Sequence, residues 1–431
     1  MSELAEYLAR QNPHWSGLPL ETGISRPFYL EKIQRYLSVG EILVLNGVRR
    51  AGKTTLLWQT IRSLLGQGRD PRSILFVNCD EPAILHCADP LGDVLATYQR
   101  EIYGGDDVVL VFDEIQEISG WEHWVKAWYD RKKFRIILSG SSAKLLDSGI
   151  SRRISGRYLK VPVYPLDFAE YLSFFGEQVP SDVVDAGLRK YRIFELLRSY
   201  LQFGGFPAAA RIADEQIRTE HLSTYFESIL FRDIEEQHDI RNPTVLRKLL
   251  AYAAANISVP YSYRALANVF GSDPRIITDY LTFAEDAFLF FTVSQFSYSL
   301  KSQAVNGKKL YMIDTGLRNA VAFRFSSDQG RLVENAVYVH LRRYGYVPYF
   351  WKGTGEVDFL IMHRDSSFTA INVCYSDDMP EREVRGLSEC SQILSGEVRR
   401  MILITKDLER EENGVMFVPL WKWLLANPCM V

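Results

Sequence analysis

The sequence has few cysteines, no long apolar run and no strong net charge. Its five cysteines among 431 residues are an odd number, widely spaced and without a CxxC pair, which argues against a disulfide framework and a structural zinc site. No window approaches the ~18 apolar residues that a membrane helix needs, and the first fifteen residues lack the pattern of a secretory signal. We therefore expect a cytoplasmic protein with no membrane partner.

The charge is unevenly distributed around a net value of −3. Residues 131–160 contain nine Lys or Arg and one acid, and residues 241–310 contain eight Lys or Arg and four acids. Local basic stretches, rather than the net charge, therefore decide where an anionic partner would bind. With 47% hydrophobic and 24% charged residues, the chain has the composition of a folded protein of two to four domains.

Apolar runs of strand length alternate with helical segments in the first part of the chain. The four runs are residues 41–46, 73–78, 108–112 and 134–138, and they are rich in branched side chains. Buried parallel strands have this length and composition. The alternation predicts an α/β domain with a parallel sheet and helices on both faces.

Residues 241–320 carry the signals of a winged helix-turn-helix. A short helix ends in a glycine, and Asp273 with Pro274 then supplies the N-cap and first position of a second helix. Two aromatic, β-rich runs follow. Helix, turn, helix and β-hairpin in this order predict a winged helix, with Arg275 and Thr278 on the outer face of its second helix as candidate DNA contacts.

A complete phosphate-binding motif follows the first predicted strand. Residues 47–54 read GVRRAGKT and match GxxxxGK[ST], with a helix after them. The glycines let backbone N–H groups wrap phosphate oxygens, Lys53 neutralises the β- and γ-phosphates, and Thr54 offers a hydroxyl to Mg²⁺. A chance glycine-rich turn is the alternative, which the flanking elements disfavour. The expected nucleotide-binding residues are Gly47, Val48, Arg49, Arg50, Ala51, Gly52, Lys53, Thr54 and Thr55.

A second strand end supplies two carboxylates. The apolar run 108–112 is followed by Asp113, expected to order the Mg²⁺ shell, and by Glu114, expected to polarise the attacking water. A strand end of this kind is often simply solvated, but its position about sixty residues after the phosphate motif favours a nucleotide site. No Asn-Lys-x-Asp sequence is present, so the expected ligands are ATP and Mg²⁺.

Hydroxyl and guanidinium groups follow the strand at residues 134–138. Ser139 and Ser141 stand where an ATPase sheet places a polar side chain against the γ-phosphate or the water, although a serine-rich turn explains them equally well. Arg152, Arg153 and Arg157 lie within six residues. Such a cluster repels itself unless an anion is near, and the two candidates are DNA and the γ-phosphate. A solvated basic loop is the simpler alternative for each arginine.

Several motifs together resemble the prokaryotic AAA-type ATPases known as archaeal-type ATPases. They are GVRRAGKTTLL, VVLVFDEIQEI, LSGSSAKLL, SGRY followed by VPVYPLDFAEYL, and GGFP. The resemblance extends from about Phe28 to Thr405 and implies ATP binding in a ring of subunits, so we expect a homo-oligomer. It also places a Gly-Arg pair at Gly156-Arg157, which favours Arg157 as the residue serving the nucleotide in cis or in trans. Arg152 and Arg153 are then candidates for contact with DNA or with a neighbouring subunit.

The last part of the chain looks like the usual C-terminal partner in that family, a domain of unknown function with a restriction-endonuclease-like fold. Nucleases of this fold use a helix Glu, a strand-end Asp and a Glu-x-Lys on the next strand. Glu334 and Asp358 fit the first two positions, but Asn372 replaces the second Glu and Cys374 replaces the Lys. We expect a degenerate, inactive nuclease-like domain, with Glu356 as a conceivable substitute ligand.

The expected architecture is α/β with four parts. They are a P-loop ATPase core with an N-terminal helix (1–165), a helical lid (166–240), a winged helix-turn-helix (241–320) and the degenerate endonuclease-like domain (321–431).

Two functions from different classes fit this order. One is Mg²⁺-dependent ATP hydrolysis coupled to the binding or remodelling of duplex or branched DNA. The other is a slow nucleotide-controlled switch that acts in regulation or defence through protein contacts. An active nuclease is disfavoured by the residues at positions 372 and 374.

Overall fold

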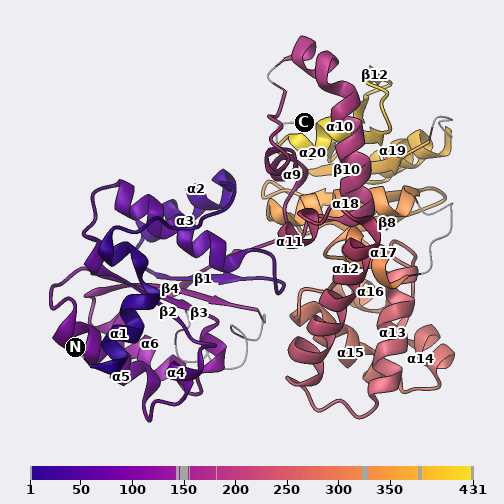
Figure 1. The fold of residues 1–431 in the computed structure, drawn as a ribbon. Helices are drawn as coiled ribbons and strands as arrows, with labels where there is room; N and C mark the ends of the chain where they lie inside the picture. Colours follow the sequence, from indigo (N-terminus) through magenta and orange to yellow (C-terminus); the bar gives the residue numbers. More distant parts are fainter. Residues whose placement is uncertain are drawn as a thin grey trace. The chain divides into compact units, whose positions relative to one another are not determined.

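A computed structural model of the chain describes residues 2–141, 145, 154, 156–180, 182–322, 329–376 and 381–428. They form two compact units that divide between Val163 and Tyr164 (Figure 1). The expected end of the ATPase core at residue 165 lies within two residues of this division. The three later parts of the expected architecture all belong to the second unit, where their separation into domains stays a prediction.

The first unit contains a five-stranded parallel sheet with the order β2-β3-β4-β1-β5. Its strands are β1 (Ile42–Asn46), β2 (Ile74–Asn78), β3 (Val108–Asp113), β4 (Phe134–Gly140) and β5 (Tyr158–Pro162). The parallel α/β sheet expected from the sequence is confirmed. Because β3, β4 and β1 are neighbours, the segments that leave their carboxyl ends lie side by side at one edge.

Helices cover both faces of this sheet. They are α1 (Glu3–Gln11), α2 (Pro27–Leu37), α3 (Lys53–Gly66), α4 (Pro82–Leu85), α5 (Pro90–Glu101) and α6 (Trp121–Asp130). Figure 1 shows α2 and α3 on one face and α1, α5 and α6 on the other. Every residue of β1 and β3 is buried, which explains why these strands read as continuous apolar runs. Phe112 of β3 stacks on Trp128 of α6 with ring centroids 5.4 Å apart.

The second unit begins with helices, as the periodicity predicts. They are α9 (Phe168–Phe174), α10 (Val183–Phe203), α11 (Pro207–Ala210), α12 (Glu215–Ile229), the π-helical turn η4 (Leu230–Glu235), α13 (Pro243–Ala255) and α17 (Thr315–Val321). Helices α10 and α12 pack against α17 within this unit. Their expected role as a lid stays a prediction.

The helix-turn-helix segment has the elements that the sequence predicts. They are α14 (Tyr263–Phe270), α15 (Pro274–Asp286), β6 (Phe290–Ser294), α16 (Leu300–Val305) and β7 (Lys308–Met312). Gly271 ends α14 with a φ of +58°, and the Asp273 side chain caps α15. Strands β6 and β7 are antiparallel, and Tyr261 forms a bridge to Lys308. The short helix α16 between the strands was not expected.

The chain ends in a six-stranded mixed sheet with the order β12-β13-β11-β10-β9-β8. The strands are β8 (Tyr349–Lys352), β9 (Glu356–Met362), β10 (Phe368–Cys374), β11 (Val398–Thr405), β12 (Arg410–Glu412) and β13 (Val415–Pro419). The helices of this part are α18 (Gln329–Arg343), α19 (Glu381–Ile393) and α20 (Leu420–Leu425). The Phe296 N–H donates to the Phe350 carbonyl at 2.7 Å, which joins the β6–β7 hairpin to edge strand β8. Across the described ranges, no helix combines the length and apolarity needed to cross a bilayer.

Candidate nucleotide site and carboxylate cluster

The loop between β1 and α3 depends on glycine at two positions. Gly47 has a φ of +151°, and a Cβ there would lie 2.1 Å from the Val163 carbonyl oxygen. Gly52 precedes α3 with a φ of +95°. Only glycine combines such angles with so close an approach of two backbones. A loop with this backbone suits phosphate binding, in which backbone N–H groups must reach a ligand without a Cβ in the way.

Lys53 is buried inside this loop, with 4% of its surface exposed. Its ammonium donates to the carbonyl oxygens of Gly47 at 3.1 Å and Val48 at 3.2 Å. The Glu114 carboxylate lies 3.9 Å away. Phosphate oxygens make stronger, charge-assisted hydrogen bonds than carbonyl oxygens do, so these contacts are ones that an entering triphosphate can replace.

Asp113 joins three elements at the carboxyl edge of the sheet. One of its carboxylate oxygens accepts the Thr54 hydroxyl at 2.6 Å, and the other accepts the hydroxyl of Ser139. Burial raises the pKa of Asp113, against the lowering effect of these two hydrogen bonds. A carboxylate paired with the P-loop threonine hydroxyl is the donor set that Mg²⁺ prefers in nucleotide sites.

Glu114 adopts a left-handed conformation with a φ of +51°, which is uncommon for a residue with a side chain. Its N–H donates to the Ser139 hydroxyl at 3.2 Å, and its carboxylate accepts the Gln116 amide at 2.5 Å. Ser141 accepts a hydrogen bond from Arg49 at 3.4 Å. Strand β4 therefore brings both expected serines to the same edge as the P-loop.

Arg157 lies at the opposite edge of the sheet. It directly precedes β5, and its carbonyl accepts the N–H of Ile42 at the start of β1. Its guanidinium pairs with Asp130 at 3.1 Å. A five-residue strand spans ~16 Å, so Arg157 starts about one strand length from the edge that carries the P-loop. Its service to the nucleotide, in cis or in trans, stays a prediction, and Arg152 and Arg153 lie outside the described residues.

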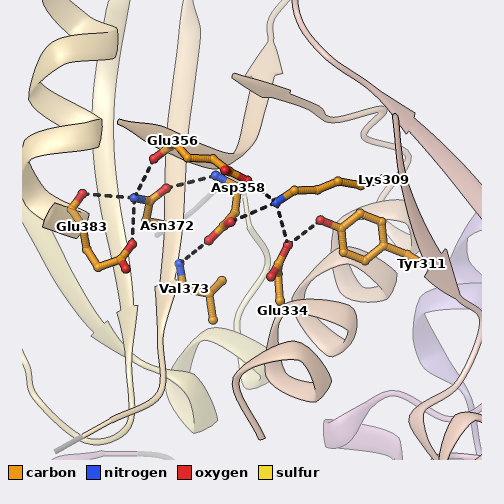
Figure 2. A network of polar contacts seen from close by, with 8 residues as sticks. All are labelled: Lys309, Tyr311, Glu334, Glu356, Asp358, Asn372, Val373 and Glu383. Carbon is orange, nitrogen blue, oxygen red and sulfur yellow. Dashed lines mark hydrogen bonds and ion pairs between the residues drawn. The ribbon is translucent and has the colours of Figure 1, made fainter. Parts of the chain in front are cut away.

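The second unit brings Glu334 and Asp358 together, as the sequence predicts, around an unexpected lysine (Figure 2). Glu334 comes from α18, Glu356 and Asp358 come from β9, and all three carboxylates contact the ammonium of Lys309 on β7. Burial and the neighbouring Asp358 raise the pKa of Glu334, while Lys309 lowers it. Tyr311, two residues along the same strand, donates to Glu334 at 2.6 Å.

Asn372 and Cys374, at the positions where a nuclease of this fold has Glu and Lys, have structural surroundings. The Asn372 amide accepts the Asp358 N–H at 3.0 Å and donates to the Glu356 carbonyl at 3.1 Å, and it also donates to Glu383 (Figure 2). It therefore fastens β9 and α19 to β10. Cys374 belongs to the apolar core between the sheet and α19. Among the described residues, no group of three or more His, Cys, Asp or Glu side chains is arranged to hold a metal ion.

Comparison with known proteins assigns separate families to the first unit and to the two halves of the second unit. Residues 39–172 match an AAA domain family, and residues 194–328 and 329–423 match two domains of unknown function, DUF8612 and DUF4143. The uncharacterized protein MJ1544 of Methanocaldococcus jannaschii is 32% identical over 418 residues, which cover 91% of this chain and 90% of that protein. The chain belongs to the MJ1544 family. An uncharacterized protein of Haemophilus influenzae is 27% identical and covers 93% of this chain and 98% of its own length.

Solved structures share a partial likeness with this MJ1544-family chain. The Aeropyrum pernix ORC1 protein in complex with DNA has a TM-score of 0.32 at 12% identity, covering 70% of this chain and 93% of its own. AMPPCP-bound DnaA from Aquifex aeolicus has a TM-score of 0.28 at 19% identity, covering 63% and 90%. At TM-scores of this size the likeness carries no conclusion about function. The P-loop assignment rests on the AAA domain match and on the geometry above.

Two basic residues of this family member were not predicted from the sequence. Lys309 is one. The other is Arg26, buried before α2, which donates to the Ala51 carbonyl of the P-loop at 3.0 Å and lies over the Tyr29 ring at 4.5 Å. Pro27 opens α2, but nothing local in the sequence indicated that Arg26 before it turns inward.

The expected DNA-contact residues lie at the start of α15. Arg275 is exposed, and the Thr278 hydroxyl donates to the Pro274 carbonyl at 2.8 Å. The N-terminal turn of the second helix is the part that reads DNA in helix-turn-helix proteins. DNA contact by either residue stays a prediction, and the Thr278 hydroxyl is hydrogen-bonded within its own helix.

Proposed function

We propose that the AAA domain binds and hydrolyses ATP with Mg²⁺. The observation that carries this proposal is the pairing of Asp113 with the Thr54 hydroxyl beside the buried Lys53. Thr54 and Asp113 are the residues that would hold Mg²⁺. Bound Mg²⁺ would supply charge neutralisation at the β- and γ-phosphates.

The remaining roles follow from position at the carboxyl edge of the sheet. Lys53 would exchange its two carbonyl partners for phosphate oxygens. Glu114, next to Asp113, would orient the attacking water, and Gln116 would hold its carboxylate in place. Ser139 would fix the orientation of Asp113 and of the Glu114 backbone together, since its hydroxyl contacts both.

An ATPase assay with a matched pair of variants tests this proposal. Lys53→Ala removes the buried ammonium, and Arg62→Ala removes an exposed cation from the same helix. We expect Lys53→Ala to weaken binding of a fluorescent ATP analogue by about a hundredfold, because hydrogen bonds to a charged partner contribute about 1.5–3 kcal/mol each. Arg62→Ala and wild type should bind alike, and EDTA should abolish turnover. Equal binding by Lys53→Ala would refute the site.

We further propose that ATP hydrolysis is coupled to DNA through the helix-turn-helix segment. The proposal is supported by the capped α14–α15 pair, the β6–β7 hairpin and the exposed Arg275. Duplex or branched DNA should then raise the ATPase rate several-fold, and Arg275→Ala should weaken this stimulation more than Arg189→Ala on α10. Loss of a phosphate contact should also reduce the salt dependence of DNA binding.

A nucleotide-controlled switch acting through protein contacts is the second candidate, since winged helices also bind proteins. The same assay separates the two functions. An ATPase rate unaffected by any DNA, with turnover that stays slow, would favour the switch. Assembly into a ring on adding ATP, measured by size-exclusion chromatography with light scattering, is expected for the DNA-coupled function.

A further inference from the structure

Lys309 is the centre of the carboxylate cluster in the second unit (Figure 2). Its ammonium lies 3.2 Å from Glu334, 2.7 Å from Glu356 and 3.3 Å from Asp358. Only 2% of the residue is exposed. These carboxylates come from a helix and a strand that are distant from Lys309 in sequence, so the fold itself brings them to one point.

An ammonium ion has three donors, and three different carboxylates surround this one. The three carboxylates lie within 3.3 Å of this buried ammonium and compensate its charge. Lys309 therefore stands at the meeting point of oxygen ligands from α18 and β9. A hard divalent cation is held by oxygens in the same manner.

An ammonium that contacts all three carboxylates competes with a divalent cation for the same oxygens. A metal ion bound to them would lie within a few ångströms of the ammonium, and two cations at that separation in a buried site repel strongly. The next residues of β7 are also fixed to α18. Tyr311 donates to Glu334, and the Asn335 amide exchanges two hydrogen bonds of 2.7 and 2.8 Å with the backbone of Met312.

We propose that Lys309 is a built-in counter-ion that takes the place of a divalent cation at the Glu334, Glu356 and Asp358 cluster. The second unit then binds no divalent ion at this point, and removal of the ammonium turns the cluster into a divalent-cation site. The lysine missing from position 374 is therefore not restored as a catalytic group. Lys309 instead fastens the last strand of the helix-turn-helix segment to α18 and β9. This inference does not depend on the ATPase proposal.

Mn²⁺ binding to the full chain without nucleotide tests this proposal, with free Mn²⁺ measured by electron paramagnetic resonance. All proteins carry Asp113→Asn, which removes the carboxylate expected to order Mg²⁺ in the first unit. We expect no binding at millimolar Mn²⁺ for this background or for Lys308→Met, the neighbouring lysine on β7. Lys309→Met should bind one Mn²⁺ with an affinity at least about tenfold above the detection limit set by the background protein, since the repulsion from the ammonium is gone. Adding Asp358→Asn should abolish this gain.

Two results would overturn the proposal. One is a folded Lys309→Met protein, by circular dichroism, that gains no Mn²⁺ site. The other needs no Lys309 variant: Mn²⁺ raises the melting temperature of the Asp113→Asn chain, and Glu356→Gln or Asp358→Asn removes the rise. An unchanged melting temperature in that second measurement supports the proposal even if Lys309→Met fails to fold.

Discussion

Lys53 in the first unit and Lys309 in the second are both buried beside carboxylates, yet the two lysines are held differently. Lys53 contacts two backbone carbonyls, and the Glu114 carboxylate is 3.9 Å away. Lys309 contacts three carboxylates within 3.3 Å. Neutral carbonyl partners are easily given up for a phosphate, whereas a buried ion pair cannot be opened without leaving an uncompensated charge.

The difference shows how the same residue type serves binding in one place and fixed structure in another. In the P-loop, Lys53 donates to backbone carbonyls, and in the proposed function it would exchange them for phosphate oxygens. In the carboxylate cluster the charge of Lys309 is already neutralised by the chain. Variants that remove charge should therefore affect turnover in the first unit and stability in the second.

The largest expected effect concerns turnover in the first unit. Glu114→Gln keeps the size of the side chain but removes the carboxylate that would polarise water. We expect kcat to fall by about 10²- to 10⁴-fold while ATP affinity stays near that of wild type, so that bound ATP is trapped. Filter-binding of labelled ATP and steady-state hydrolysis measure the two quantities. Turnover at the wild-type rate would remove Glu114 from the catalytic role.

The next largest effect is the loss of stability when either of the two lysines is replaced. Lys309→Met removes a buried ammonium from between three carboxylates, two of them mostly buried, and should lower the free energy of unfolding by about 3 kcal/mol. Lys53→Met removes hydrogen bonds to neutral carbonyls and should cost about 1 kcal/mol. Urea denaturation of both variants gives the values, with the half-buried Lys308→Met as the control on β7. Equal costs for Lys309→Met and Lys308→Met would contradict the comparison.

A smaller effect of pH is expected in the second unit from His340, which is buried and contacts the Ala426 carbonyl at 3.0 Å. Burial lowers the pKa of His340 to about 4. In the unfolded chain the His340 ring is protonated below its ordinary pKa of 6.5, whereas in the folded chain it stays neutral down to about pH 4. Stability contributed by the neutral ring is present above pH 6.5 and is lost as the pH falls toward 4.

The variant His340→Gln isolates this contribution, because the glutamine amide can still donate to Ala426 but does not titrate. Between pH 7 and pH 4.5, we expect wild type to lose about 2–3 kcal/mol more stability than the variant, since one pKa unit corresponds to about 1.4 kcal/mol. Urea titrations at the two pH values measure the difference. Parallel losses in the two proteins would show that His340 is not the group responsible.

The smallest expected effect concerns Arg157, which pairs with Asp130 away from the P-loop edge. At protein concentrations where the chain is monomeric, Arg157→Ala should leave the ATPase rate unchanged within about twofold, since an exposed ion pair contributes at most about 1 kcal/mol. A large loss in the monomer would contradict the placement. A loss that appears only on self-association would support the trans role.

Local sequence signals were sufficient to predict which residues meet at the carboxyl edge of the parallel sheet. The P-loop, Asp113 and Ser139 each directly follow an apolar strand, and a parallel sheet brings such positions to one edge. Arg157 also adjoins a strand, but at its amino end, and the sequence did not show that its helix partner would be Asp130. A basic loop was one of the alternatives for this residue.

Lys309 could not be found in this way. Lys308 and Lys309 are adjacent on one strand and look equivalent in the sequence, yet only the register of β7 decides which one is buried. The carboxylates that surround Lys309 are contributed by residues 334, 356 and 358. Prediction by motif looked for the lysine on β10, because the resemblance placed it there, and long-range packing supplied it from another segment.

The hydrogen bond between Phe296 and Phe350 has a practical consequence for fragments of this protein. Strand β8 is an edge strand, and the β6–β7 hairpin occupies part of its free side. A fragment beginning at residue 329, where the last family match starts, would uncover that edge and lose the cation that neutralises its buried acids. Exposed strand edges promote aggregation. Fragments for expression should therefore begin near residue 164.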